Sequence, residues 1–147
     1  MTPGIVKRIQ KAEKDYAQRD FENALIQALI AVAATSRTRY PSLGDRAGFE
    51  KLLAEDFGPN LAANIKIISG GIKIQYQGQL QTVEHILYKY LRCNLLHEAE
   101  LPPDIEFVSP ETGIIFAPGD GKLVMGYQLI QSLVLIVKNA PENSGLF

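Results

Sequence analysis

Apolar side chains recur at three- and four-residue intervals through the first third of the chain, which is the spacing of amphipathic helices. This pattern predicts a helix over residues 4–19 and a second helix over residues 21–34, for which Asp20 is the expected N-cap. The second segment is nearly continuously apolar and rich in alanine, so we expect a buried helix that a neighbouring helix can approach closely. A loop should follow over residues 37–44, because Pro41 disfavours helix at the residue before it.

The middle third combines helical periodicity with glycine and proline breaks. Its predicted elements are a helix over residues 45–57 with Asp45 as its cap, a short helix over residues 60–69, a strand or extended loop over residues 72–76, and a helix over residues 79–97. The helix over residues 79–97 is the longest of these, and Pro102 prevents its continuation.

The last third indicates short strands followed by one apolar helix. Its predicted elements are strands over residues 105–108, 113–116 and 122–125, a hairpin connection over residues 117–121, a helix over residues 127–138 and a frayed tail over residues 140–147. The sequence contains no internal repeat and no linker. We therefore predict a single, mainly α domain over residues 1–147, with a helical bundle over residues 1–100 and a small β-hairpin appendage over residues 104–126 before the last helix.

The composition supports one ordinary globular domain and argues against binding through bulk charge. The chain has 147 residues, 46% of them hydrophobic, and a formal net charge of −1. Because nonspecific binding to nucleic acid scales with the number of phosphates neutralised, we expect no protein that coats nucleic acid and no DNA partner. The charge balance is +2 over residues 1–100 and −3 over residues 101–147, so an anionic ligand should prefer the first of these segments.

Cysteine usage and the length of apolar runs bear on compartment and cofactors. Cys93 is the single cysteine, which excludes an internal disulfide. It has no neighbouring Cys, so metal or redox chemistry is not indicated and no cofactor is expected. No uncharged apolar run reaches the ~20 residues that would span a bilayer. We expect a cytoplasmic protein that does not associate with a membrane.

Polar residues with catalytic potential interrupt the long helix near its C-terminal end, where four residues separate Arg92 from His97. An RNA strand carries its own nucleophile, the 2′-OH. Cleavage without a metal then needs a proton acceptor near neutral pH and a fixed cation beside the phosphate. His97 fits the first role and Arg92 the second. On an ideal helix the two residues lie about 140° apart, so one subunit would hold an incomplete site unless the helix ends near His97 or the Arg92 side chain bends back.

The segment from Tyr88 to Glu98 resembles the HEPN superfamily, helical proteins whose signature is an Arg followed after a short spacer by a His. An aromatic-rich lead-in, a leucine pair before the His, an acidic residue after it and a proline-terminated exit match as well. The resemblance implies a HEPN-like bundle that dimerises through this helix and acts as a metal-independent endoribonuclease in toxin–antitoxin or phage-defence systems. Many active members place Asn or Asp directly after the Arg, whereas this chain has Cys93 there and Asn94 one position later.

The resemblance and the chemistry together assign roles to individual residues. We expect catalytic roles for Arg92, His97 and Asn94, supporting roles for Tyr88, Glu98 and Lys89, and RNA-binding roles for Arg37, Arg39, Tyr40 and Arg46. The expected partners are a second copy of the chain, an RNA substrate, and an antitoxin or another protein.

An alternative function keeps the fold without the chemistry. In that case Arg92 pairs with Glu84, Glu98 or a carbonyl at the end of the helix, and His97 serves only as a favourable charge near the helix C-terminus. The protein would then be a noncatalytic HEPN-like module for protein interaction or nucleotide binding.

Two further features leave alternatives open. His85 lies two helical turns before Arg92, and it either extends the site or is an ordinary surface histidine. A small-molecule binder would show a deep apolar pocket lined by Tyr76, Tyr88 and Tyr90.

Overall fold

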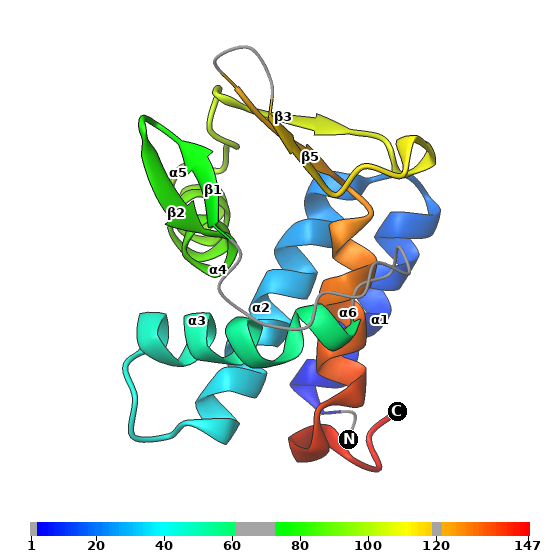
Figure 1. The fold of residues 1–147 in the computed structure, drawn as a ribbon. Coiled ribbons are helices and arrows are strands. Elements are labelled where there is room, and N and C mark those ends of the chain that lie inside the picture. Colours follow the sequence, from blue (N-terminus) through cyan, green and yellow to red (C-terminus); the bar gives the residue numbers. More distant parts are fainter. Residues whose placement is uncertain (1–2, 61–72, 119–121) are drawn as a thin grey trace.

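The computed structural model describes residues 3–60, 73–118 and 122–147, which form a mainly helical protein with two small sheets (Figure 1). The longer helices are α1 (Gly4–Ala17), α2 (Phe21–Arg39), α3 (Asp45–Asp56) and α6 (Leu129–Asn139). Helices α1, α3 and α6 all pack against α2. The helices predicted for the first third are confirmed, and the helix predicted over residues 60–69 falls largely outside the described residues.

Helix α2 is longer than the sequence predicts. It continues to Arg39, so the expected loop over residues 37–44 begins only at Tyr40. The hydroxyls of Thr35 and Ser36 donate to backbone carbonyls one turn earlier, which keeps these polar residues compatible with a buried helix. Pro41 does end the helix, because Tyr40 before it leaves the helical backbone conformation.

The predicted N-caps are only partly observed. Asp20 occupies the N-cap position of α2, but its carboxylate accepts from the Asn23 side chain at 2.8 Å and not from a backbone N–H. Gly44 takes the cap position of α3, and Asp45 is the first helical residue. Asp45 therefore acts on α3 through its charge in the first turn, where a carboxylate stabilises the helix dipole.

The core lies where α2 meets α1 and α6. Small side chains of α2 are fully buried there, including Ala24, Ala28 and Ala31, and they allow close helix packing. Helix α6 supplies large apolar residues to the same core, among them Leu129, Leu133 and Ile136. Burial of these side chains provides most of the favourable free energy of folding.

The helix that carries the motif is shorter than predicted and contains a π-helical stretch. It runs from α4 (Val83–Ile86) through a π-helix (Leu87–Arg92) into α5 (Cys93–Glu98). The backbone N–H of Cys93 donates to the Tyr88 carbonyl five residues earlier, and the segment ends at Ala99 in the left-handed conformation. Such π-helical insertions occur often at functional sites.

The prediction of helix over residues 79–82 is wrong, because these residues form a strand. The strand β1 (Lys73–Tyr76) pairs in antiparallel fashion with β2 (Gln79–Thr82). The intervening Gln77 and Gly78 both have positive φ, at 53° and 76°. This is the turn that matches the twist of a two-residue hairpin. Thr82 then caps α4 by accepting from the backbone N–H of His85.

The second sheet has three strands and contributes to the core. It consists of β3 (Ile105–Val108), β4 (Phe116–Pro118) and β5 (Leu123–Gly126), in the order β3-β5-β4. The β4–β5 pair is antiparallel as predicted, but β4 starts three residues later than the predicted strand, and β3 adds a parallel pairing to β5. Ile105, Leu123 and Met125 are buried in the main core, so the sheet is an integral layer and not an appendage.

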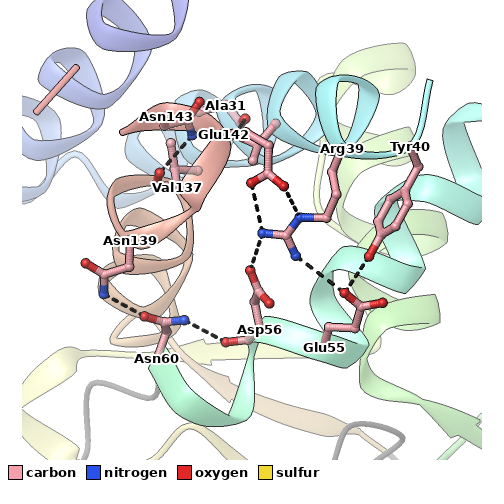
Figure 2. A network of polar contacts seen from close by, with 11 residues as sticks. Ala31, Arg39, Tyr40, Glu55, Asp56, Asn60, Val137, Asn139, Glu142 and Asn143 are labelled. Carbon is pink, nitrogen blue, oxygen red and sulfur yellow. Dashed lines mark hydrogen bonds and ion pairs between the residues drawn. The ribbon is translucent and has the colours of Figure 1, made fainter. Parts of the chain in front are cut away.

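The tail predicted to fray is docked, as Figure 2 shows. The Asn143 side chain is buried and donates to Thr35 Oγ1 at 3.0 Å and to the Val137 carbonyl at 2.8 Å. Arg39 donates to Glu142 at 2.7 Å and to Asp56 at 2.8 Å, and its side chain is only 14% exposed. We call Arg39, Asp56, Glu142 and Asn143 the tail latch, because they connect the tail to α2 and α3.

The tail latch should make stability depend on pH. The hydrogen bond from Arg39 lowers the pKa of the Glu142 carboxyl below its usual value. Its stabilisation is therefore fully present above the ordinary glutamate pKa of about 4.3 and is lost as the pH falls through the lowered value. At neutral pH we expect Glu142→Gln to reduce the free energy of unfolding by about 1–2 kcal/mol. This difference from wild type should shrink in urea titrations below about pH 4.

The control for this measurement is Glu106→Gln, which changes an exposed glutamate of β3. Its effect should stay within about 0.5 kcal/mol at both pH values. A Glu142→Gln effect that is equally large in acid would contradict the assigned role of the ion pair.

Candidate functional site

Arg92 lies half-buried against two aromatic rings at the end of the π-helix. Its guanidinium carbon is 5.2 Å from the ring centre of Tyr88 and 6.0 Å from that of Phe49. The two rings are themselves 5.4 Å apart and tilted by 58°. Arg92 Nε is buried and has no hydrogen-bond partner within the described part of the chain. The rings thus hold the cation by cation–π attraction while its charge is not neutralised by a described carboxylate.

Local structure explains this placement. Phe49 is fully buried on α3, and α3 packs against the π-helix. Tyr88 and Arg92 are four residues apart on that helix, which puts their side chains side by side. The guanidinium therefore extends back over the Phe49–Tyr88 pair.

His97 lies near the C-terminal end of the helical segment that also carries Arg92. It is exposed in the last turn of α5, and the structure describes no contact between its ring and the Arg92 side chain. Between them Asn94 is half-buried, and Leu96 is 45% exposed. An α-helix turns by about 140° over five residues, which agrees with the lack of a described contact between them.

The three residues expected to support the site, Tyr88, Lys89 and Glu98, differ in their relation to Arg92. Tyr88 contacts Arg92 directly, whereas the ammonium group of Lys89 lies 5.3 Å from the ring centre of Tyr90. The side chain of Glu98 lies outside the described part of the structure. Tyr88 is therefore the supporting residue whose position bears directly on Arg92.

The four residues expected to bind RNA do not form one basic surface. Arg39 is committed to the tail latch. Tyr40 donates to Glu55 Oε2 at 2.5 Å, and burial together with this carboxylate raises the pKa of its hydroxyl. Arg37 is exposed and lies 3.9 Å from Asp45, and Arg46 is exposed in the first turn of α3. Of the four, only Arg37 and Arg46 present most of their side chain to solvent.

A second polar cluster joins α3 to α4, and we call it the His85 cluster. Its members are Arg46, Glu50 and His85. His85 Nδ1 lies 2.7 Å from Glu50 Oε1, and Arg46 Nε donates to Glu50 Oε2 at 3.1 Å. Arg46 Nη2 is also 3.1 Å from His85 Nδ1. The His85 and Glu50 side chains are only 19% and 21% exposed, so His85 is not a free surface histidine.

The His85 cluster lines a groove with a volume of about 590 Å³ between α3, β2 and the start of α4. The other lining residues are Lys51, Ala54, Gln79, Leu80, Gln81, Thr82 and Glu84. Burial, and to a lesser extent the nearby Glu50, raises the pKa of the Glu84 carboxyl. Charged side chains of both signs and the amides of Gln79 and Gln81 therefore line this groove.

A small-molecule binder is expected to have a pocket lined by Tyr76, Tyr88 and Tyr90, but these residues do not line either hollow that the structure describes. Tyr76 and Tyr90 pack edge to face at 4.8 Å and line neither the groove at His85 nor a second, more apolar hollow between α1 and α6.

Within the described ranges no group of three or more His, Cys, Asp or Glu side chains is placed to hold a metal ion. Among the same residues, no helix has the length and apolar character needed to cross a membrane.

Comparison with known proteins adds one finding. The model of the Rv1289 family matches residues 4–146, which is nearly the whole chain. No curated protein and no solved structure matches.

Proposed function

This chain belongs to the Rv1289 family, and we propose that it is a HEPN-like, metal-independent endoribonuclease that acts as a homodimer. The observation that carries the proposal is the state of Arg92, a half-buried guanidinium held by two rings without a described carboxylate partner. A cytoplasmic role in a toxin–antitoxin or phage-defence system, with an antitoxin or other protein as partner, belongs to the same proposal.

Arg92 differs from the other arginines of the chain. Hydrogen bonds or ion pairs with side chains of the same chain engage Arg8, Arg19, Arg37, Arg39 and Arg46. Arg92 has lost part of its hydration without gaining such a partner in the described structure, and an unpaired cation in that position attracts an anion. The planar guanidinium presents parallel N–H groups that suit phosphate oxygens.

His97 supplies proton transfer in the proposed reaction. Its imidazole accepts the proton of a ribose 2′-OH, O2′ attacks the adjacent phosphorus, and the bond from phosphorus to the 5′-oxygen breaks. The imidazolium then gives this proton to the leaving 5′-oxygen. Arg92 stabilises the negative charge of the transition state, and Asn94 orients the scissile group. The products are a 2′,3′-cyclic phosphate and a free 5′-OH.

The separation of Arg92 from His97 supports a dimeric site. Because each chain presents the two groups on different sides of one helix, Arg92 of one copy would act with the imidazole of a second copy. The exposed Leu96 beside His97 offers apolar area for that contact. Sedimentation of the purified protein should therefore show a dimer.

RNA cleavage in EDTA tests the proposal. We expect Arg92→Ala and His97→Ala each to lower the cleavage rate by about a hundredfold or more, which is the usual loss when a transition-state cation or a general base is removed. Arg92→Lys should recover only part of the rate, because a lysine lacks the planar fork. Gel analysis of a labelled RNA, with phosphatase treatment to identify the cyclic end, measures both rate and product.

The matched control is Arg8→Ala, which removes an exposed arginine that donates to Gln27 at 3.0 Å. It should cleave like wild type. Equal cleavage by all variants, or none by wild type, would remove the assignment. Wild type that binds RNA through Arg92 but leaves it intact would instead favour the noncatalytic binding module.

A further inference from the structure

We propose that the groove at the His85 cluster is a second catalytic site, which hydrolyses a ribonucleoside 2′,3′-cyclic phosphate to a phosphate monoester. His85 would be the general base, Glu50 its positioning residue, and Arg46 the ligand of the phosphate. The choice of substrate rests on the proposed function, whose product carries this cyclic end, whereas the chemistry of the groove stands on its own residues.

The contacts of His85 Nδ1 determine which ring nitrogen carries the proton. Glu50 Oε1 lies 2.7 Å away and Arg46 Nη2 lies 3.1 Å away. A carboxylate at the shorter distance requires a proton between the two atoms, so we assign the hydrogen to Nδ1, which donates to Glu50. With its hydrogen on Nδ1, the imidazole carries a lone pair on Nε2, for which the structure describes no hydrogen bond.

The surroundings fix the orientation of this base. The backbone N–H of His85 donates to Thr82 Oγ1 at 3.2 Å, which anchors the first turn of α4. The ring itself lies edge to face with Tyr90, with centroids 6.3 Å apart. Glu50 holds the other side of the imidazole from α3. Glu50 thus holds the imidazole in one orientation and one tautomer, with Nε2 left to act on a substrate.

Arg46 keeps donors available for an anion. Its Nε binds Glu50, while its side chain is 61% exposed. A guanidinium has five N–H groups, so most of them remain for phosphate oxygens after the bond to Glu50 is made. Arg46 and Lys51 balance Glu50 and Glu84 around the groove, so a phosphate does not meet a net negative charge.

The polar lining of the groove favours a nucleotide over an apolar ligand. Its volume of about 590 Å³ falls within the range that small-molecule sites occupy. Gln79, Gln81 and Thr82 line it with amide and hydroxyl groups, which can donate to and accept from ribose hydroxyls and base edges. Leu80 is 66% exposed and provides an apolar surface for one face of a base.

The proposed step balances without a metal or a further reactant. His85 Nε2 takes a proton from water, the water oxygen attacks phosphorus, and one of the two ring bonds from phosphorus to a ribose oxygen breaks. The imidazolium returns the proton to that ribose oxygen. Water is consumed, and a nucleoside monophosphate with a free neighbouring hydroxyl is formed.

Cytidine 2′,3′-cyclic phosphate in EDTA is the probe, and phosphorus NMR resolves the cyclic diester from the monoester. Wild type should convert it, and His85→Gln should lower the rate by about a hundredfold or more. Arg46→Lys, at an exposed position that tolerates change, should mainly raise the KM. Glu50→Gln should lower the kcat of ring opening with little change in KM, because Glu50 acts through His85 and does not touch the substrate; a purely structural role of Glu50 would leave the kcat of the folded variant unchanged.

Cleavage of a long RNA by the same proteins separates this proposal from the proposed function. Ring opening and strand cleavage are measured on different substrates, so each can fail without the other. Arg8→Ala should open the ring at the wild-type rate. No conversion by folded wild type, or wild-type conversion by His85→Gln, would overturn the assignment of the groove.

Discussion

Alanine in place of Gly126 should unfold the protein under conditions in which wild type is stable. Gly126 is the last residue of β5, and its N–H donates to the Ile115 carbonyl at 2.8 Å. An added Cβ would lie 1.6 Å from the Ile114 carbonyl oxygen and 2.7 Å from its carbon. These are backbone atoms of a neighbouring segment, so no side-chain rotation relieves the clash.

We expect Gly126→Ala to cost about 3–5 kcal/mol, because either β5 leaves the sheet or residues 114–115 move away from the core. Circular dichroism during thermal unfolding should show a midpoint lowered by about 10 °C or more. Helix α6 follows β5 after two residues, so the distortion reaches the centre of the core.

Gly48→Ala is the matched control. Gly48 is also buried, but an added Cβ there meets its nearest neighbours at 3.8 Å, an ordinary contact distance. Because Gly48 lies inside α3, alanine should raise stability by up to about 1 kcal/mol through helix propensity. A Gly126→Ala protein as stable as Gly48→Ala would show that the segment before β4 does not lie where the structure puts it.

Loss of Arg39 should be the largest effect of removing one charge from this protein. The guanidinium lies 2.7 Å from Glu142, 2.8 Å from Asp56 and 3.5 Å from Glu55. Arg39→Met keeps much of the side-chain volume but leaves several carboxylates close together without a cation. Removal of one partner from a buried ion pair costs about 3–5 kcal/mol, and we expect the lower end of that range because Glu55 and Asp56 keep some contact with water.

Urea unfolding at neutral pH measures this cost. Arg39→Lys should lie between wild type and Arg39→Met, because lysine keeps the charge but cannot donate to several carboxylates in a fork. Arg8→Met, at an exposed arginine, should change the free energy of unfolding by less than about 0.5 kcal/mol. An effect of Arg39→Met no larger than that of Arg8→Met would mean that the tail latch does not hold in solution.

Local patterns in the sequence predict α1 and α6 well, because each has one clear apolar face or a long apolar run. They do not predict β2, since Leu80 also fits the apolar spacing of the helix that follows. The left-handed turn at Gln77 and Gly78 reverses the chain, so that residues 79–82 pair with β1 before the helix begins. Local sequence patterns also do not predict the parallel pairing of β3 with β5, because it joins strands that are separated by a long connection.

The docked tail shows how tertiary contacts override composition. Its proline, asparagine and glycine residues are typical of a frayed end. The buried hydrogen bond from Asn143 to Thr35 and the pairing of Glu142 with Arg39 join residues more than a hundred positions apart in the chain. No local signal identifies such partners.

In the candidate site too, the sequence predicts individual residues, whereas their neighbours depend on tertiary packing. The sequence identifies Arg92 and His97 by residue type and spacing, but the cradle that Phe49 forms for Arg92 depends on how α3 packs. Arg46 and Glu50 are four apart, so their ion pair could be predicted as a helix-surface contact. That His85 completes the cluster follows only from the packing of α3 against α4.

The position of α6 in chain order has a consequence for biosynthesis. This helix supplies much of the central core, yet it follows all the other long helices in the sequence. During translation α1 and α2 leave the ribosome with the apolar surfaces that α6 covers still open to water. We therefore expect the core to close only after residues 129–139 have emerged, and until then the nascent chain exposes apolar surface that a chaperone can bind.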